Sequence, residues 1–148
     1  MDVRRITAAM TRVVRHPVLR AGLPPESAIL PHDDDDETRH FGAFDGDRLI
    51  GVATFFPEAY AGRPNEPAWR LRGMATLDDR QRTGAGRALI EEGLRAAKED
   101  GAALIWCNAR VTAQGFYEKM GFVAVGPMFD LAPAGKHYVM IKDLRERA

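Results

Sequence analysis

The chain has 148 residues, with 45% hydrophobic and 8% aromatic residues, 21 Lys and Arg against 21 Asp and Glu, and one cysteine. At roughly 150 residues per domain, this predicts a single domain over residues 1–148, and the composition excludes collagen-like, coiled-coil and wholly disordered chains. A formal net charge of zero provides no long-range positive field, so nucleic acid is not expected as a partner.

The first part of the chain predicts a strand, a helix and a loop. Residues 3–6 favour a short edge strand, and Thr7 is suited to cap the helix that follows. That helix has apolar residues at roughly helical spacing, namely Met10, Val13, Val14 and Val18. Pro17 is expected to end or kink it. The proline-rich and acidic residues 22–36 predict a surface loop.

A hairpin and a third strand are predicted next. Two runs of β-favouring residues, 40–44 and 49–56, flank the turn at residues 45–47, whose Asp-Gly pair is a strong hairpin signal. A loop rich in proline covers residues 57–67. The following strand has two chemically different faces. These faces are Trp69, Leu71, Gly73 and Ala75 on one side, and Arg70, Arg72, Met74 and Thr76 on the other.

The second half of the chain predicts a strand–helix–strand unit. An amphipathic helix extends from Gly84 to a cap at Gly101. The continuous apolar run 102–107 follows it, as expected of a buried strand that lies parallel to the one before the helix. Three further elements are a short helix over 111–119 and strands over 121–125 and 136–142. We therefore expect an α+β fold: one central mixed, mostly antiparallel sheet with a parallel β-α-β unit and flanking helices.

The sequence lacks the patterns of disulfide, metal and membrane proteins. Cys107 is the only cysteine and ends an apolar strand, so a buried, unreactive thiol is expected. The acidic run between His32 and His40 matches neither an EF-hand nor a zinc motif, so no metal is expected. No apolar stretch approaches the roughly 18 residues of a membrane span, and no signal peptide is recognisable. A soluble, cytoplasmic protein without a membrane partner is predicted.

Residues 81–87 place two glycines where a strand gives way to a helix. Backbone N–H groups at a helix N-terminus are unpaired, so glycines there allow a phosphate to approach the main chain. Arg82 and Arg87 can add charge-assisted contacts. Two glycines alone nevertheless favour a simple tight turn. A P-loop is excluded because Arg87 stands where it requires lysine, and a dinucleotide fingerprint because Leu89 stands where it requires a third glycine.

A second pattern lies about thirty residues further on, in the run Phe-Tyr-Glu-Lys-Met-Gly-Phe at residues 116–122. It places an aromatic pair on a short helix that stops at a glycine and enters a strand. Taken alone, Phe116 and Tyr117 are typical of ordinary core aromatics, and Gly121 is typical of an ordinary helix cap.

Together, in order and spacing, the two patterns resemble the GCN5-related N-acetyltransferase (GNAT) family. The first carries its Q/R-x-x-G-x-G/A signature as Gln81-x-x-Gly84-x-Gly86, and residues 113–122 carry its A-x-x-F/L-Y-x-x-x-G-F signature. The closely matching text covers about residues 71–122, and the flanking strands suit the same fold. The resemblance implies a single GNAT-like domain that uses acetyl-CoA and releases CoA.

The resemblance also implies roles for individual residues. The pyrophosphate of acetyl-CoA would lie on the turn formed by Gln81, Arg82, Thr83, Gly84, Ala85, Gly86 and Arg87. The pantetheine amides would pair with the strand edge at Met74, Ala75 and Thr76, and an N–H group at Met74 or Ala75 would be the oxyanion donor. Tyr117 occupies the position of the general acid that protonates the leaving thiolate. Arg110 stands where many members have asparagine, and Asn108 is the alternative cofactor contact.

The expected function is direct acetyl transfer from acetyl-CoA to a primary amine of a small molecule or peptide. The alternatives are a non-catalytic acyl-CoA-binding or regulatory module and a domain that shares only the fold and acts through protein contacts. Besides a water chain, four side chains are candidates for the general base: Glu58, Glu66, Asp130 and His137. The acidic run favours a cationic acceptor, whereas Arg70 and Arg72 favour an anionic one unless salt bridges hold them. The sheet edge and the last strand also allow a homodimer.

Overall fold

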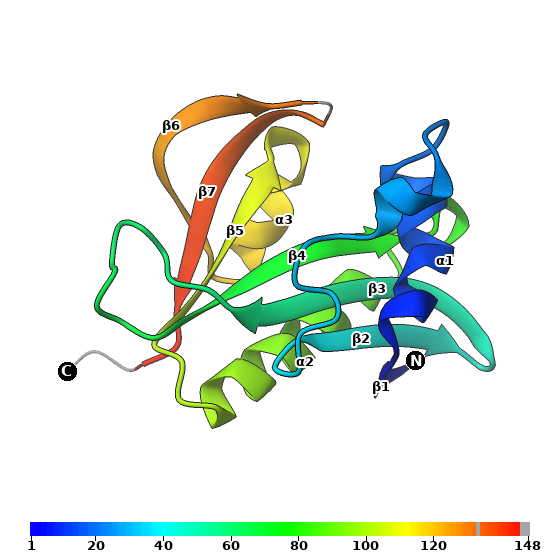
Figure 1. Cartoon of the computed structure of the whole chain (residues 1–148), viewed down its shortest axis with the longest axis horizontal. Coiled ribbons are helices and arrows are strands. Elements are labelled where there is room, and N and C mark those ends of the chain that lie inside the picture. Colours follow the sequence, from blue (N-terminus) through cyan, green and yellow to red (C-terminus); the bar gives the residue numbers. More distant parts are fainter. Residues whose placement is uncertain (133, 146–148) are drawn as a thin grey trace.

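A sheet of seven strands organises the computed structural model, which describes residues 1–132 and 134–145 (Figure 1). The strands are β1 (Asp2–Arg5), β2 (Arg39–Asp45), β3 (Arg48–Pro57), β4 (Ala68–Thr76), β5 (Leu104–Arg110), β6 (Val123–Leu131) and β7 (Gly135–Asp143). They lie in the order β1-β2-β3-β4-β5-β7-β6, and every neighbouring pair is antiparallel except β4 and β5. This mixed sheet confirms the predicted α+β fold.

Helices cover both faces of the sheet. They are α1 (Ala8–Leu19), α2 (Ala85–Glu99) and α3 (Gln114–Lys119), with 3₁₀ turns at Pro25–Ala28, Asp78–Arg80 and Val111–Ala113. Successive residues of β3 show that α1 and α2 lie on opposite faces: Thr54 accepts a hydrogen bond from Arg15 of α1, and Phe55 packs against Gly93 of α2. None of the described helices is long and apolar enough to cross a membrane.

Most predicted elements are confirmed with small changes in their bounds. The hairpin of β2 and β3 turns at Gly46, whose φ is 60°. The helix predicted after Gly84 is α2, and Gly101 follows it in the left-handed conformation with φ 87°. The largest difference is β6, which extends to Leu131, beyond the predicted 121–125.

The start of α1 is as predicted, but its end is not. Thr7 caps the helix, and its Oγ1 accepts a hydrogen bond from the N–H of Met10 at 3.2 Å. Pro17 does not end the helix, which continues to Leu19. The proline lies close to the C-terminus, so the missing N–H removes one hydrogen bond without interrupting a long helix.

The buried face of α1 also differs from the predicted apolar face. Val13 is 66% exposed, while Thr11 and Arg15 are buried beside Val14. Arg15 is buried because it forms a bidentate ion pair with Asp33, at 2.6 and 3.0 Å. The prediction of a solvated loop over the acidic run is therefore wrong at Asp33, which is 5% exposed.

This ion pair belongs to a buried polar network that includes His40. Nη2 of Arg15 donates to Oγ1 of Thr54 at 2.7 Å, and that hydroxyl lies 2.8 Å from Nδ1 of His40. Nε2 of His40 lies 2.8 Å from the carbonyl oxygen of Asp33. Because a carbonyl only accepts, Nε2 carries the proton and Nδ1 accepts from Thr54. The network therefore favours the neutral ring.

The network predicts a loss of stability in mild acid. Burial lowers the pKa of His40, and the charges of Arg15 and Arg5 lower it further, although the bond to Asp33 raises it. Below its ordinary pKa of about 6.5, the unfolded chain therefore binds more protons at this residue than the folded chain does. The free energy of unfolding is expected to fall between pH 7 and pH 5.

Urea unfolding at several pH values measures this effect. In His40→Gln, which keeps a donor and an acceptor but cannot titrate, the fall should be smaller than in the unsubstituted protein. An equal fall in both proteins would contradict the assignment to His40.

Candidate active site

β4 and β5 lie side by side only at their beginnings. Their parallel ladder ends at the pair Arg70 and Trp106. Beyond it β4 continues beside β3 and β5 continues beside β7, so the two strands diverge (Figure 1). Within the described strands, their facing edges therefore carry N–H and C=O groups that no ladder pairs. An extended ligand arm that contains amides can pair with such an edge.

A glycine bulge interrupts β4 where the two strands diverge. In the register of β3 and β4, Gly73 and Met74 together lie opposite Ala53. Gly73 has φ 64°, a left-handed conformation that favours glycine in such bulges. Arg15 fills the space beside it, since a β-carbon on Gly73 would lie 2.7 Å from Nε of Arg15. The buried network of α1 thus packs directly against the bulge.

The bulge shifts the alternation of side chains in β4 by one residue. Leu71 packs in the core under α2, whereas Ala75 packs against α1. The predicted strict alternation of this strand is therefore wrong beyond the bulge. Met74 joins the face of α2 and α3, while Arg72 lies on the opposite face. Gly73, a glycine inside a strand pattern, is the sequence signal from which the bulge could have been predicted.

The turn before α2 presents free backbone N–H groups. Gly84 caps the helix with φ 92°, and no side chain caps it. The first hydrogen bond of the helix runs from the N–H of Ala88 to the carbonyl of Gly84, at 3.0 Å. In the described part of the chain, the N–H groups of Ala85, Gly86 and Arg87 have no partner. Three free donors at a helix N-terminus have the arrangement that can bind a phosphate.

Two side chains stabilise this turn by hydrogen bonds to its own backbone and to the end of β4. Nε2 of Gln81 donates to the carbonyl of Thr76 at 3.4 Å, which ties the turn to the end of β4. Oγ1 of Thr83 donates to the carbonyl of Arg80 at 2.6 Å. Both side chains are exposed. Their contacts are structural and leave the N–H groups of the helix start open.

The two arginines predicted for this turn differ in their contacts. Arg82 is exposed, has φ 65°, and forms no hydrogen bond or ion pair with any described residue. Arg87 is held by Glu91, with Nε 2.9 Å from Oε1. Arg82 is therefore the cation of the turn that is free to pair with a bound anion.

Tyr117 lies on α3 with its hydroxyl group in the core. The residue is 8% exposed, and its ring packs edge-on against Phe116 and Phe122. Its Oη lies 3.7 Å from Sδ of Met74, a weak acceptor. Burial raises the pKa of this hydroxyl well above its ordinary value, and Cys107 nearby raises it further. The group is a protonated donor at neutral pH.

Met74 connects Tyr117 to the glycine turn. Its Cε lies so close to Gly86 that an added β-carbon there would be 2.9 Å away, and Phe116 Cζ would be 3.2 Å from the same carbon. Three segments far apart in the sequence, namely the bulge of β4, the start of α2 and α3, thus meet around one methionine. The arrangement places a proton donor beside a soft sulfur atom, close to the free N–H groups.

Cys107 does not take part in this chemistry. It is 2% exposed, as predicted. Burial is the main cause that raises the pKa of its thiol, to about 12, although the charge of Arg70 lowers it slightly. The thiol is therefore protonated and inert at neutral pH.

Asn108 lies on the other face of β5 from Tyr117. Its neighbours Cys107 and Ala109 belong to the core that contains Tyr117, so Asn108 and Arg110 point away from that core. The structure does not bring Asn108 beside Tyr117, and its cofactor contact stays a prediction.

The face of β4 and β5 opposite Tyr117 carries charged and aromatic side chains. Nη1 of Arg70 lies 3.0 Å from Oε2 of Glu58, and the same guanidinium lies 4.7 Å from the ring centroid of Trp106. Nε1 of Trp106 donates to the carbonyl of Glu58 at 2.9 Å, and Tyr60 packs against the indole. Of the two predicted roles of Arg70, a salt bridge to a neighbour or binding of an anionic acceptor, the structure therefore shows the salt bridge.

The other predicted candidates for a general base have different surroundings. Glu66 is paired with Arg63, and Asp130 is exposed on β6. His137 is the buried member of the set. Its Nδ1 donates to the carbonyl of Gly135 at 2.7 Å, which leaves a lone pair on Nε2 when the ring is neutral.

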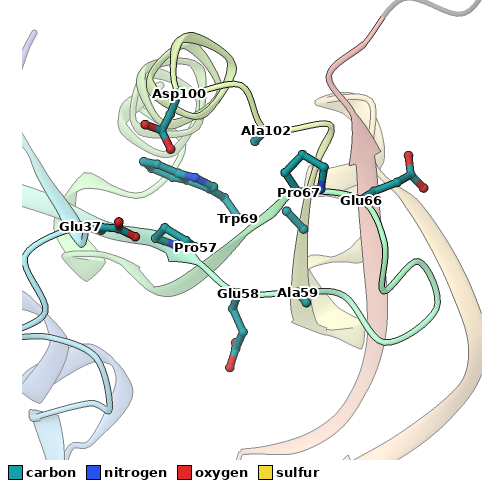
Figure 2. Close-up of a pocket in the computed structure, with 10 residues that line it drawn as sticks. Glu37, Pro57, Glu58, Ala59, Glu66, Pro67, Trp69, Asp100 and Ala102 are labelled. Carbon is teal, nitrogen blue, oxygen red and sulfur yellow. The ribbon is translucent and has the colours of Figure 1, made fainter.

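A separate pocket of about 360 Å³ lies at the beginning of β4 (Figure 2). Its lining residues are Glu37, Pro57, Glu58, Ala59, Glu66, Pro67, Ala68, Trp69, Asp100 and Ala102. Asp100 and Glu37 lie near the indole of Trp69, whereas the carboxylates of Glu58 and Glu66 point away from it (Figure 2). None of the predicted cofactor residues lines this pocket.

Known proteins resemble this chain in sequence and in fold. The model of the acetyltransferase (GNAT) family matches residues 9–122. A Bacillus subtilis (strain 168) protein named uncharacterized N-acetyltransferase YitI is 35% identical over 145 residues, which is 98% of this chain and 97% of that protein.

Two solved structures illustrate the range of proteins with this fold. An aminoglycoside 6'-N-acetyltransferase complexed with coenzyme A has a TM-score of 0.79 and 16% identity, over 100% of this chain and 99% of that one. The ribosomal-protein-S18-alanine N-acetyltransferase of Escherichia coli has a TM-score of 0.72 and 14% identity, over 99% and 96%. These likenesses support the fold, and the two names refer to very different acceptors.

Proposed function

The chain belongs to the acetyltransferase (GNAT) family, and on this basis we propose that it transfers the acetyl group of acetyl-CoA directly to a primary amine. The acceptor is a small molecule or a peptide, and the whole reaction takes place in one domain over residues 1–148. The observation that carries the proposal is the meeting of Met74, Gly86 and Tyr117 in one cluster beside the divergence of β4 and β5.

The residues present fit acetyl-CoA in two places. The free N–H groups of Ala85, Gly86 and Arg87 suit its pyrophosphate, and Arg82 adds an exposed cation beside them. The unpaired edge of β4 after Arg70 suits the amides of its pantetheine arm. When bound, acetyl-CoA supplies an activated acetyl group on a sulfur leaving atom.

The chain's own residues then perform two tasks. With acetyl-CoA and an amine bound, the N–H of Met74 or Ala75, beside the bulge, would donate to the thioester oxygen as negative charge develops on it. Oη of Tyr117 would donate its proton to the sulfur, whose bond to the acetyl carbon would be replaced by a bond from the amine nitrogen. The proton lost by the amine returns to the tyrosinate through solvent or a base, so the enzyme is regenerated.

Thermal unfolding with added ligands tests the cofactor class. A ligand specific to the native state stabilises it by about 2.7 kcal/mol at a hundredfold excess over Kd. For a chain of this length, that is a rise in Tm of roughly 5–10 °C. Acetyl-CoA and CoA should produce the rise, and NAD and ATP should not. If none of the four ligands raised the Tm, the proposal would be contradicted.

Product analysis separates the enzyme from a non-catalytic acyl-CoA-binding module. The protein is incubated with acetyl-CoA and a set of amines, and free CoA thiol and acetylated amine are measured in the same sample. We expect the two products in equal amounts. Tight binding of acetyl-CoA without any acetylated amine would favour the binding module instead.

A further inference from the structure

Arg72 differs from Arg70, its neighbour on the same face of β4. It lies on β4 just before the bulge, on the face opposite Tyr117, and it is half-buried. Among the described residues it forms no hydrogen bond or ion pair, whereas Arg70 is held by Glu58 at 3.0 Å. None of the side-chain nitrogens of Arg72 is among the fully buried unpaired ones of the described residues, so the guanidinium is open to an anion that approaches this face.

The charges around Arg72 are mostly positive. Burial is the largest cause that lowers its pKa, and the charges of Arg70 and then Arg20 lower it further. Glu58 acts in the opposite direction, and Arg15 adds a smaller positive effect. The guanidinium therefore lies in a positive field that a bound anion would relieve.

The neighbouring carboxylates already form ion pairs with other arginines. Asp33 is bound by Arg15 at 2.6 Å, and Glu58 is bound by Arg70. Among the described residues, the side chain of Arg20 at the end of α1 donates to the carbonyl of Leu19, at 3.1 Å, and to no carboxylate. Each of these two ion pairs is neutral as a whole. Of the charges named here, the two without a carboxylate partner are therefore Arg72 and Arg20.

The acidic run does not supply the missing anion. No ion pair joins Arg72 to residues 34–37, all of which the structure describes, and the charges that most shift its pKa are those of Arg70, Arg20, Glu58 and Arg15. Of the two opposite predictions about the charge of the acceptor, this face therefore favours the anionic one. The local charge is positive.

The uncompensated charge lies close to the proposed reaction centre. Arg72 precedes Met74 by two residues in β4, with only the bulge at Gly73 between them. An amine that reaches the thioester from this face would bring its own substituents next to the guanidinium.

We propose that Arg72 binds a carboxylate or phosphate group of the acceptor, so that the preferred acceptor is a small amine that carries a negative charge. This inference rests on the proposed acetyl transfer and specifies its substrate class. Arginine is suited to the task because its planar fork matches carboxylate and phosphate oxygens in a bidentate geometry.

Matched pairs of amines test the inference. The carboxylate arm compares amino acids with their α-amides, beginning with glycine and glycinamide, and the phosphate arm compares phosphoethanolamine with ethanolamine. For each pair, kcat/KM is measured by release of CoA thiol and by the mass of the product. The anionic member of at least one arm should be preferred roughly tenfold to a hundredfold, the effect of one hydrogen-bonded ion pair.

Three variants assign this preference to its residue. In Arg72→Met the preference should fall about tenfold or more, while acetyl-CoA still raises the Tm. Arg72→Lys keeps the charge and should retain part of the preference. Arg4→Gln removes an exposed arginine of the β1 edge strand and should retain all of it. Because each value is a ratio between paired amines, the intrinsic reactivity of the amines cancels between variants.

The outcomes separate this inference from the proposed function. Acetylation of neutral or cationic amines in preference to anionic ones would overturn the inference and leave acetyl transfer intact. A preference that survives in Arg72→Met would overturn the assignment to this residue. Binding of acetyl-CoA without acetylation of any amine would overturn the inference in favour of the non-catalytic module, and absence of acetyl-CoA binding would overturn both.

Discussion

Replacement of Tyr117 by phenylalanine is expected to lower kcat by about a hundredfold or more, within the range that a general acid contributes. The ring would keep its packing against Phe116 and Phe122, so the substitution removes the hydroxyl and little else. Without Oη the sulfur must leave as an unprotonated thiolate. Since the hydrogen-bond partner of this hydroxyl among the described residues is Sδ of Met74, a weak acceptor, its loss should cost little stability.

The measurement separates catalysis from binding. Steady-state assays give kcat, and titration with acetyl-CoA gives Kd, which should change by less than about threefold. Tyr60→Phe is the matched control, because its hydroxyl lies against Gly62 in the loop before β4 and not in the proposed site. An unchanged kcat in Tyr117→Phe would remove this residue from the mechanism.

A glutamate in place of Gly84 is expected to weaken acetyl-CoA binding by a hundredfold or more. Gly84 has φ 92° and no atom within 4 Å of a built β-carbon, so the new side chain has room but the backbone is strained. Its carboxylate would lie beside the free N–H groups at the start of α2, where it would compete with phosphate and repel it. Isothermal titration with acetyl-CoA measures the loss.

The other end of the same helix offers a close control. Gly101 has φ 87° and is equally open, so Gly101→Glu introduces the same backbone strain and the same charge. It lies beyond the C-terminus of α2, away from the proposed phosphate site. Both variants should lose stability, but only Gly84→Glu should lose the cofactor. Equal binding by the two variants would contradict the proposed phosphate site.

The sequence was sufficient for the elements whose residues repeat with a clear period. The helix after Gly84 has an apolar stripe, and the hairpin around Gly46 has alternating strands with an Asp-Gly turn, so local patterns alone predicted them. The ordered pair of motifs also predicted which turn and which aromatic pair belong to one site. Their contact through Met74 needed the structure, because it joins three segments that are distant in the chain.

The errors at Asp33 and Val13 have a common physical cause, which is tertiary contact between polar groups. Asp33 is buried by a bond to Arg15, eighteen residues away, and no local pattern distinguishes it from the exposed aspartates beside it. Val13 is exposed because Arg15 and Thr11 take the buried face of α1. The bulge at Gly73 moved Met74 to the other face of β4, which a strict alternation cannot anticipate.

A crystal structure of the protein with bound CoA tests the central claim most directly. The account predicts pyrophosphate oxygens on the N–H groups of Ala85, Gly86 and Arg87, and the sulfur atom within hydrogen-bond distance of Oη of Tyr117, between the diverging edges of β4 and β5. CoA bound instead in the pocket beside Trp69, or with its sulfur remote from Tyr117, would contradict it.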